Sequence, residues 1–212
     1  MRKSWILGLV AIFALVLAGC GGGDGRDPFV LDQLSDATID AHISYDGLGS
    51  PVVVPASGTR SVTVGVDLAG IEYRGFLDFP LSGIPATADV RSAYIEVYVG
   101  SVPYGANVPV LVELVDFQPP TLVASDYFRE APSPFLEPVL GRPIFDFLPS
   151  DAVSPRPAVR IEVTSLVQRA LQRLQPDFQL RLLLDPAVPG PGIVTLDDGA
   201  AQTAPLLHVS YF

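Results

Sequence analysis

The dominant pattern along the chain is an alternation of apolar and polar residues with a period of two. In the segment 37–44, Ala37, Ile39, Ala41 and Ile43 alternate with polar residues. Rows of the same kind recur at 62–68, 74–79, 93–99, 108–114, 159–163, 178–184 and 207–211. Successive side chains of a strand point to opposite faces, so each row predicts a half-buried antiparallel strand. Turn residues at 45–49 and 186–192 separate rows, and the whole favours an all-β, antiparallel jelly-roll-like β-sandwich.

One segment, 164–175, has helical periodicity instead. Ser165 and Gln168 have the spacing of a capping box, and Pro176 ends the segment. Its apolar positions fall on one helical face and its arginines on the other, where we expect a solvated surface. The pattern predicts one short helix that closes an end of the sandwich.

The N-terminus has the order of a secretory signal peptide. Arg2 and Lys3 precede an apolar run over 5–17, shorter than the roughly 20 residues that a membrane-spanning helix needs. We therefore expect residues 1–19 to be removed. The run ends in Leu17-Ala18-Gly19-Cys20, which resembles the bacterial lipobox.

The lipobox resemblance implies that the thiol of Cys20 receives diacylglycerol and that Cys20 becomes the acylated first residue. The alternative is an ordinary signal peptide that contains a cysteine. Cys20 is the single cysteine of the sequence, which excludes an intramolecular disulfide. Gly21 stands where an aspartate commonly retains such lipoproteins at the inner membrane, so the resemblance favours a lipid-anchored protein of the cell envelope, at the outer membrane if the host has two.

Two further regions follow Cys20. Residues 20–33 begin with a glycine-rich stretch and are expected to form a flexible tether, and residues 34–212 form the β-sandwich domain. Removing Arg2 and Lys3 from the 13 basic residues leaves 11 against 23 acidic ones, a formal charge of −12. This charge argues against nucleic acid and anionic lipid headgroups as partners.

The order of the segments resembles the DNRLRE-domain family, which are secreted jelly-roll modules similar to carbohydrate-binding modules. The likeness lies in five stretches: 37–44, 74–85 (RGFLDFPLSGIP), 92–99 (SAYIEVYV), 161–168 (IEVTSLVQ) and 204–211 (APLLHVSY). The eponymous string is absent, and 116–120 and 126–128 replace the family's tryptophan-containing segment. The resemblance implies the fold and a glycan-binding class of function.

Aromatic and charged residues alternate on two predicted strands. Sugar-binding jelly rolls stack aromatic rings on pyranose faces and bind hydroxyls with polar side chains. We therefore predict a glycan platform if the two strands are adjacent, made of Arg74, Phe76, Asp78, Tyr94, Glu96 and Tyr98, with Tyr104 overhanging from a loop. The alternatives are a second buried layer or a solvated sheet face. Trp5, the single tryptophan, leaves with the signal peptide.

A structural Ca²⁺ site is a further candidate, because carboxylates near the two ends of the domain meet if the terminal strands pair. Asp197 and Asp198 are the proposed ligands, with Asp36 and Asp40 as additional candidates. Adjacent aspartates also occur simply as turn formers, which is the alternative interpretation.

Catalytic motifs find little support in the sequence. His42 and His208 fall at predicted outward strand positions, and neither a Gly-x-Ser-x-Gly elbow nor a glycine-rich phosphate loop is present. We therefore expect a protein that is not an enzyme. Two hypotheses follow: a binding module for polysaccharide or cell-surface glycan, or a structural component that docks onto another envelope protein.

Overall fold

The computed structural model describes residues 27–117, 122–128 and 144–212. The predicted signal peptide and Cys20 lie outside these ranges. No helix within the described ranges is long and apolar enough to cross a membrane.

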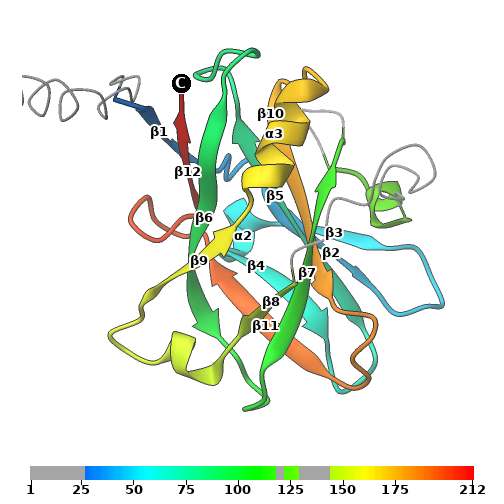
Figure 1. Ribbon diagram of the computed structural model, residues 1–212. Helices are drawn as coiled ribbons and strands as arrows, with labels where there is room; N and C mark the ends of the chain where they lie inside the picture. Colours follow the sequence, from blue (N-terminus) through cyan, green and yellow to red (C-terminus); the bar gives the residue numbers. More distant parts are fainter. Residues whose placement is uncertain (1–26, 118–121, 129–143) are drawn as a thin grey trace, which may run out of the picture.

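The described chain is an antiparallel β-sandwich, which confirms the predicted fold class (Figure 1). Its strands are β1 (Phe29–Leu34), β2 (Ala41–Tyr45), β3 (Val52–Pro55), β4 (Ser61–Val66), β5 (Glu72–Pro80), β6 (Val90–Ser101), β7 (Val108–Val115), β8 (Ile144–Phe147), β9 (Ala158–Glu162), β10 (Asp177–Leu184), β11 (Gly192–Asp197) and β12 (Leu206–Tyr211). One layer contains β1, β12, β6 and β9. The other contains β3, β2, β5, β10, β7 and β8, and β4 and β11 connect the two.

The core lies between the layers and follows the predicted alternation. In β5, Leu77 and Phe79 are fully buried, and they pair with the equally buried Leu180 and Phe178 of β10. In β6, alternate residues from Ala93 to Val99 complete the other side of this core. Each buried leucine or phenylalanine contributes about 1.5–3 kcal/mol relative to exposure, so this core is the main source of stability.

The main helix, α3 (Thr164–Gln172), is shorter than predicted but lies where the pattern placed it. It covers one end of the sandwich with Leu166, Val167, Ala170 and Leu171 buried (Figure 1). The predicted capping box is wrong, because Gln168 Nε2 donates to the carbonyl of Val90, at 2.8 Å. The described ranges also contain the shorter helical segments α2 (Ala56–Thr59), η1 (Ala124–Phe128) and η2 (Pro149–Ala152).

The N-terminal boundary of the domain differs from the prediction. Residues 29–34 form β1, which pairs along its full length with β12, so the last part of the predicted tether belongs to the sheet. The segment FVLDQL has apolar residues at adjacent positions and therefore lacks a clear period of two. Conversely, residues 37–39 form a turn, and the strand predicted from 37 begins at Ala41.

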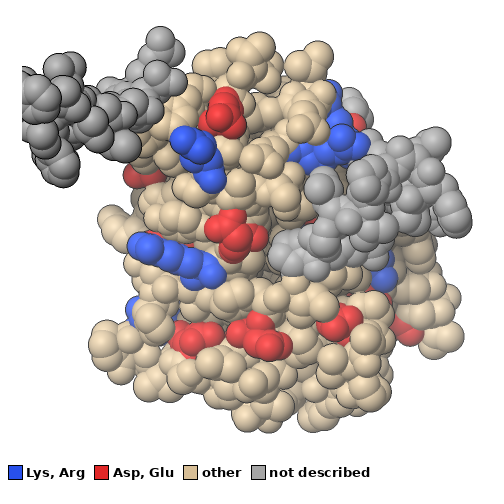
Figure 2. Space-filling view, in the orientation of Figure 1, with Lys and Arg blue, Asp and Glu red and all other residues tan. Residues whose placement is uncertain are grey.

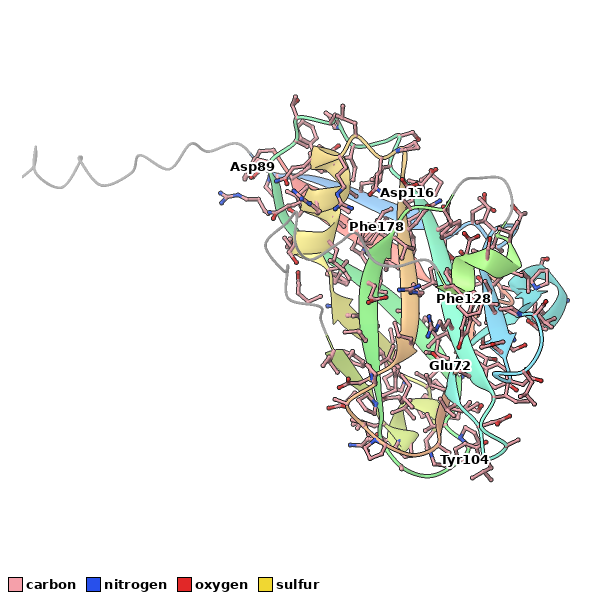
Figure 3. The ribbon with its side chains drawn as sticks, turned by 90° about the vertical axis from the view of Figure 1, so that its right-hand side faces the viewer. Glu72, Asp89, Tyr104, Asp116, Phe128 and Phe178 are labelled. Atoms are coloured by element: carbon pink, nitrogen blue, oxygen red, sulfur yellow. The ribbon has the colours of Figure 1, made fainter. Side chains whose placement is uncertain are left out.

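A second hydrophobic cluster lies on the opposite side of the β5–β10–β7 layer from the core. It contains Ala41, Ile43, Phe76, Val115, Phe117, Leu122 and Tyr127. Leu122 and Tyr127 come from the segment around η1, which therefore covers part of this face of the layer (Figure 3).

Candidate functional site

The predicted glycan platform does not exist as one surface, because its two strands are in different layers. β5 pairs with β2, β4 and β10, whereas β6 pairs with β9, β11 and β12. On β5, Phe76 and Asp78 are each 1% exposed. Phe76 belongs to the second hydrophobic cluster, so the alternative interpretation, a second buried layer, is correct for this strand. Arg74 lies at the margin of that cluster and stays partly accessible.

The β6 part of the platform lies on the outer face of the other layer. The ring of Tyr94 stacks on His208, with centroids 4.6 Å apart, and the guanidinium of Arg160 lies 4.8 Å from the same ring. Arg160 Nε also contacts Glu96 Oε2 at 3.2 Å. Tyr94 and Glu96 are therefore engaged by their own neighbours, which leaves little free ring surface for a sugar. The face drawn in Figure 2 mixes acidic and basic side chains rather than collecting one sign.

Tyr104 lies apart from both groups, in the β6–β7 connection at the lower end of the molecule in Figure 3. Its neighbour there is Tyr73. Burial and the nearby Asp67 raise the pKa of Tyr73, and Tyr104 adds to this effect. Tyr104 is therefore separated from the β5 and β6 residues of the predicted platform.

A groove of about 480 Å³ opens at that end, between the β4–β5 turn (67–71) and the β10–β11 connection (185–191). We call it the end groove. Its lining combines apolar and charged side chains: Val66, Asp67, Leu68, Gly70, Glu72, Arg74, Leu183, Leu184, Asp185, Pro186, Val188, Gly190 and Pro191. This volume lies in the usual range for small-ligand sites. The hydrophobic pattern offered no sign of it, because the two turns are more than 110 residues apart in the chain.

Arg74 is held at the wall of the end groove by a fixed polar network. Its Nε donates to Glu72 Oε1 at 2.7 Å, and its Nη1 donates to the carbonyl of Tyr127 at 2.7 Å. Tyr127 Oη donates to Glu72 Oε2 at 2.7 Å, and the Arg74 guanidinium lies 4.0 Å from the centroid of the Tyr127 ring. Burial and the bond to Glu72 raise the pKa of Tyr127. The network fixes the direction of two charged side chains before any ligand arrives.

An aromatic cluster borders this network. The rings of Tyr45, Tyr127 and Phe128 meet edge to face, with centroids 5.0–5.3 Å apart. Phe128 is 57% exposed and lies near Glu72 on the same side of the molecule (Figure 3). These residues were missed as site candidates, although the departure of 126–128 from the family's tryptophan segment was the available sign.

Behind the network, β7 and β10 carry a buried ion pair. Arg181 donates to Glu113 Oε2 through Nε at 2.9 Å and through Nη2 at 2.5 Å, and both side chains are about 5% exposed. A buried ion pair of this kind adds little net stability, because the cost of desolvating both charges offsets their attraction. The pair belongs to the support of this face rather than to its accessible surface.

The four aspartates considered for calcium are not gathered into one metal-binding set. Asp197 is engaged by Arg156 Nη2, at 3.2 Å, and by the amide of Gly199. Asp198 is 6% exposed, and both of its carboxylate oxygens lack a hydrogen-bond partner among the described residues. Within the described ranges, no three His, Cys, Asp or Glu side chains are arranged to hold a metal. Asp197 and Asp198 therefore face different surroundings.

Three aspartates have pKa values above the ordinary value of a carboxyl group, because they are buried. Burial is the main cause that raises the pKa of Asp40 well above its ordinary value and the pKa values of Asp78 and Asp198 to about 6. Asp40 Oδ1 accepts from the amide of Asp78, and Gln179 donates to Asp78 Oδ1. The backbone amide of Asp78 thus joins Asp78 to Asp40, and neither residue lines the end groove.

The two histidines have different environments. His42 was predicted to point outward but is 7% exposed, and its Nδ1 accepts from the amide of Thr63 at 3.4 Å. Its neighbours Ala41 and Ile43 point into the second cluster, so the apolar row of β2 faces away from the main core. Burial lowers the pKa of His42. His208 bridges strands through Asp32 Oδ1, at 2.6 Å.

No protein-family model matches this chain, and no curated protein matches it. The resemblance to the DNRLRE-domain family stays a prediction. The geometry of the end groove and its network is therefore the basis for a functional proposal.

Proposed function

We propose that the protein is a lipid-anchored component of the cell envelope whose β-sandwich binds polysaccharide or a cell-surface glycan without catalysing a reaction on it. The observation that carries the proposal is the end groove of about 480 Å³, with Arg74 and Glu72 held in fixed positions at its wall. Glycan sites combine apolar surface for the C–H faces of the sugar with oriented polar groups for its hydroxyls. The end groove supplies both.

The charges of the groove favour a neutral glycan. Among the described residues of the lining, Asp67, Glu72 and Asp185 contribute three carboxylates, against the one guanidinium of Arg74. A uronate or phosphate group would meet this negative excess, whereas sugar hydroxyls donate to carboxylates readily. We therefore expect an uncharged, hydroxyl-rich polysaccharide.

The carboxylates of the end groove already accept hydrogen bonds from the protein, which supports a binding role over a catalytic one. Glu72 accepts from Arg74 with one oxygen and from Tyr127 with the other. Asp67 Oδ1 accepts from the amides of Ala69 and Ile71, and its Oδ2 accepts from Tyr73. A general acid or base must be able to exchange a proton with its substrate. Each Glu72 oxygen accepts one hydrogen bond and keeps a second lone pair, so this fixed carboxylate can still accept from a sugar hydroxyl.

The anchor of this proposal is acylated Cys20. Several acyl chains hold a protein on a bilayer far more firmly than one, because each buried methylene contributes about 0.8 kcal/mol. We predict that the Cys20→Ala variant is lost from carbonate-washed membranes while the unaltered protein is retained. Retention of the variant would contradict the lipid anchor.

The glycan proposal is tested by affinity electrophoresis of the full acylated protein, in detergent, through gels that contain neutral polysaccharides. We expect retardation that weakens at least tenfold in Leu68→Ser and Arg74→Ala. Tyr98→Ala, on the outer face of the other layer, is the matched control and should migrate like the unaltered protein. Failure of every polysaccharide to retard the protein, or loss of retardation in the control alone, would refute the assignment.

A structural or protein-docking role is the second candidate, favoured by the exposed β2–β3 hairpin. Leu48 at its tip is 92% exposed and Val52 is 57% exposed. Crosslinking in intact membranes should then recover one dominant envelope protein, and Leu48→Asp should abolish that product. A Leu48→Asp variant with an unchanged crosslinking pattern would rule out docking through the hairpin.

A further inference from the structure

The end of the sandwich where β1 begins carries a small group of exposed apolar side chains. Phe29 is 67% exposed, Val30 is 69% exposed and the C-terminal Phe212 is 38% exposed. Strand pairing places them at the same end of the sandwich, because Phe29 lies opposite Tyr211, the residue before Phe212, in the β1–β12 register. We call Phe29, Val30 and Phe212 the apolar tip.

The apolar tip is held rigidly rather than hanging from a loose terminus. The rings of Phe29 and Tyr211 stack with centroids 5.8 Å apart. Phe212 exchanges two backbone hydrogen bonds with Asp89, each 3.1 Å, and the guanidinium of Arg91 lies 4.8 Å from its ring. A terminal aromatic residue fixed in this way presents its ring in a constant direction.

The tip is also the part of the domain nearest to the proposed anchor along the chain. Residues 21–28 separate Cys20 from β1, and eight residues span at most about 28 Å even when fully extended. The chain enters the domain beside the C-terminus, at the same end as α3 (Figure 1). The anchored domain therefore cannot move this end far from the bilayer surface.

We infer that the apolar tip rests on the lipid surface and that the domain stands on the membrane by this end. The inference rests on the proposed acylation of Cys20. Aromatic rings favour the interface between headgroups and acyl chains, where an apolar ring and a nearby polar backbone are both accommodated. The occupant of the tip is the interfacial region of a bilayer with uncharged or zwitterionic headgroups, because an anionic surface would repel the strongly acidic mature chain.

This orientation has a consequence for the groove. The turns that form the end groove lie at the opposite end of the sandwich from the C-terminus in Figure 1, and Figure 3 places Tyr104 far from Asp89. A domain that stands on its apolar tip points the end groove away from the membrane. The lipid surface and the glycan would then be bound at opposite ends.

The sequence allows a direct test because Trp5, in the signal peptide, is the single tryptophan. Phe212→Trp therefore places one tryptophan in the mature protein, at the tip, and this tryptophan can be excited selectively over the seven tyrosines. Leu68→Trp and Leu48→Trp are matched controls, since both positions are more exposed than Phe212 and neither belongs to the tip. Each acylated variant is reconstituted into phosphatidylcholine vesicles with and without brominated acyl chains.

We expect the brominated lipid to quench the fluorescence of the Phe212→Trp variant at least threefold more strongly than that of either control variant. Adding Phe29→Ser and Val30→Ser to Phe212→Trp should reduce this quenching toward the control level. Equal quenching in all three single variants would overturn the inference while leaving the anchor and the glycan site intact. Failure of the unaltered protein to float with the vesicles would instead refute the acylation, and the inference with it.

Discussion

At the residue scale, Gly75 shows how closely β4 crosses β5. A Cβ atom added at Gly75 would lie 2.7 Å from Val62 Cγ1 and 2.8 Å from Val64 Cγ2, both in the core. We expect Gly75→Ala to lower the free energy of unfolding by about 1–3 kcal/mol, the usual effect of overpacking. Urea unfolding measures the difference.

The control for this substitution is Gly58→Ala, since a Cβ atom there meets no described atom within 4 Å. Gly58 lies in α2, where alanine is at least as favourable as glycine, so its variant should match or slightly exceed the stability of the unaltered protein. Equal urea midpoints for the two variants would contradict the close approach of the strands.

The buried aspartates predict a stability that falls as the pH rises. The folded pKa values of Asp78 and Asp198 are raised to about 6, mainly by burial, so the folded state binds protons more tightly than the unfolded chain. The stabilising protons are lost as the pH rises through 6. We expect the free energy of unfolding to fall by about 1 kcal/mol for each group between pH 5 and pH 7.5.

Asp198→Asn isolates one of these groups, because the oxygens of Asp198 have no hydrogen-bond partner among the described residues. The variant should be more stable than the unaltered protein at pH 7.5 and should show a smaller change with pH. Urea midpoints at both pH values provide the measurement. An unchanged or steeper pH dependence in Asp198→Asn would show that burial does not raise the pKa of this carboxyl.

At the element scale, η1 is fastened to β5 through Tyr127. The Tyr127 hydroxyl donates to Glu72, and the Tyr127 carbonyl accepts from Arg74. We expect Tyr127→Phe to cost about 1 kcal/mol, the typical net contribution of one hydrogen bond, and to speed amide hydrogen exchange in η1. Tyr98→Phe is the control and should leave both quantities unchanged; unaltered exchange in η1 of Tyr127→Phe would argue against this attachment.

A strand could be predicted from sequence where its alternating apolar residues pack into the main core. The rows of β6, β7, β10 and β12 have their apolar positions inside, as the alternation indicated. β1 was missed because its apolar residues are adjacent, and only pairing with β12 reveals it as a strand. Periodicity reports which positions are apolar but not which distant strand lies beside them.

The same limit explains the failure of the predicted platform. Phe76 alternates correctly with Leu77, so its direction away from the main core was predictable. The burial of Phe76 was not predictable, because Leu122 and Tyr127, about 50 residues away, cover that face. The end groove depends likewise on two turns distant in sequence. Arg74 was identified because it lies on the same predicted strand face as Phe76, whereas its partners Glu72 and Tyr127 required the fold.

At the scale of the whole molecule, the sandwich has two ends with different proposed roles. The apolar tip, at the start of β1, faces the proposed anchor, and the end groove lies at the other end (Figure 1). Removal of residues 1–19, as predicted, would leave 11 basic and 23 acidic residues and a formal charge of −12, which would oppose adhesion of the sides to anionic surfaces. This arrangement would hold a bound glycan at the distance of one domain length from the bilayer.

The central claim is that the end groove binds a neutral glycan, and methyl NMR with isotope-labelled protein tests it most directly. Titration with an oligosaccharide of the polysaccharide that retards the protein should shift the methyl signals of Leu68, Leu183 and Val188, which line the groove. The signals of Val30, in the apolar tip, and Leu206, on β12, should stay in place. Shifts confined to Val30 or Leu206, with the groove methyls unchanged, would contradict the claim.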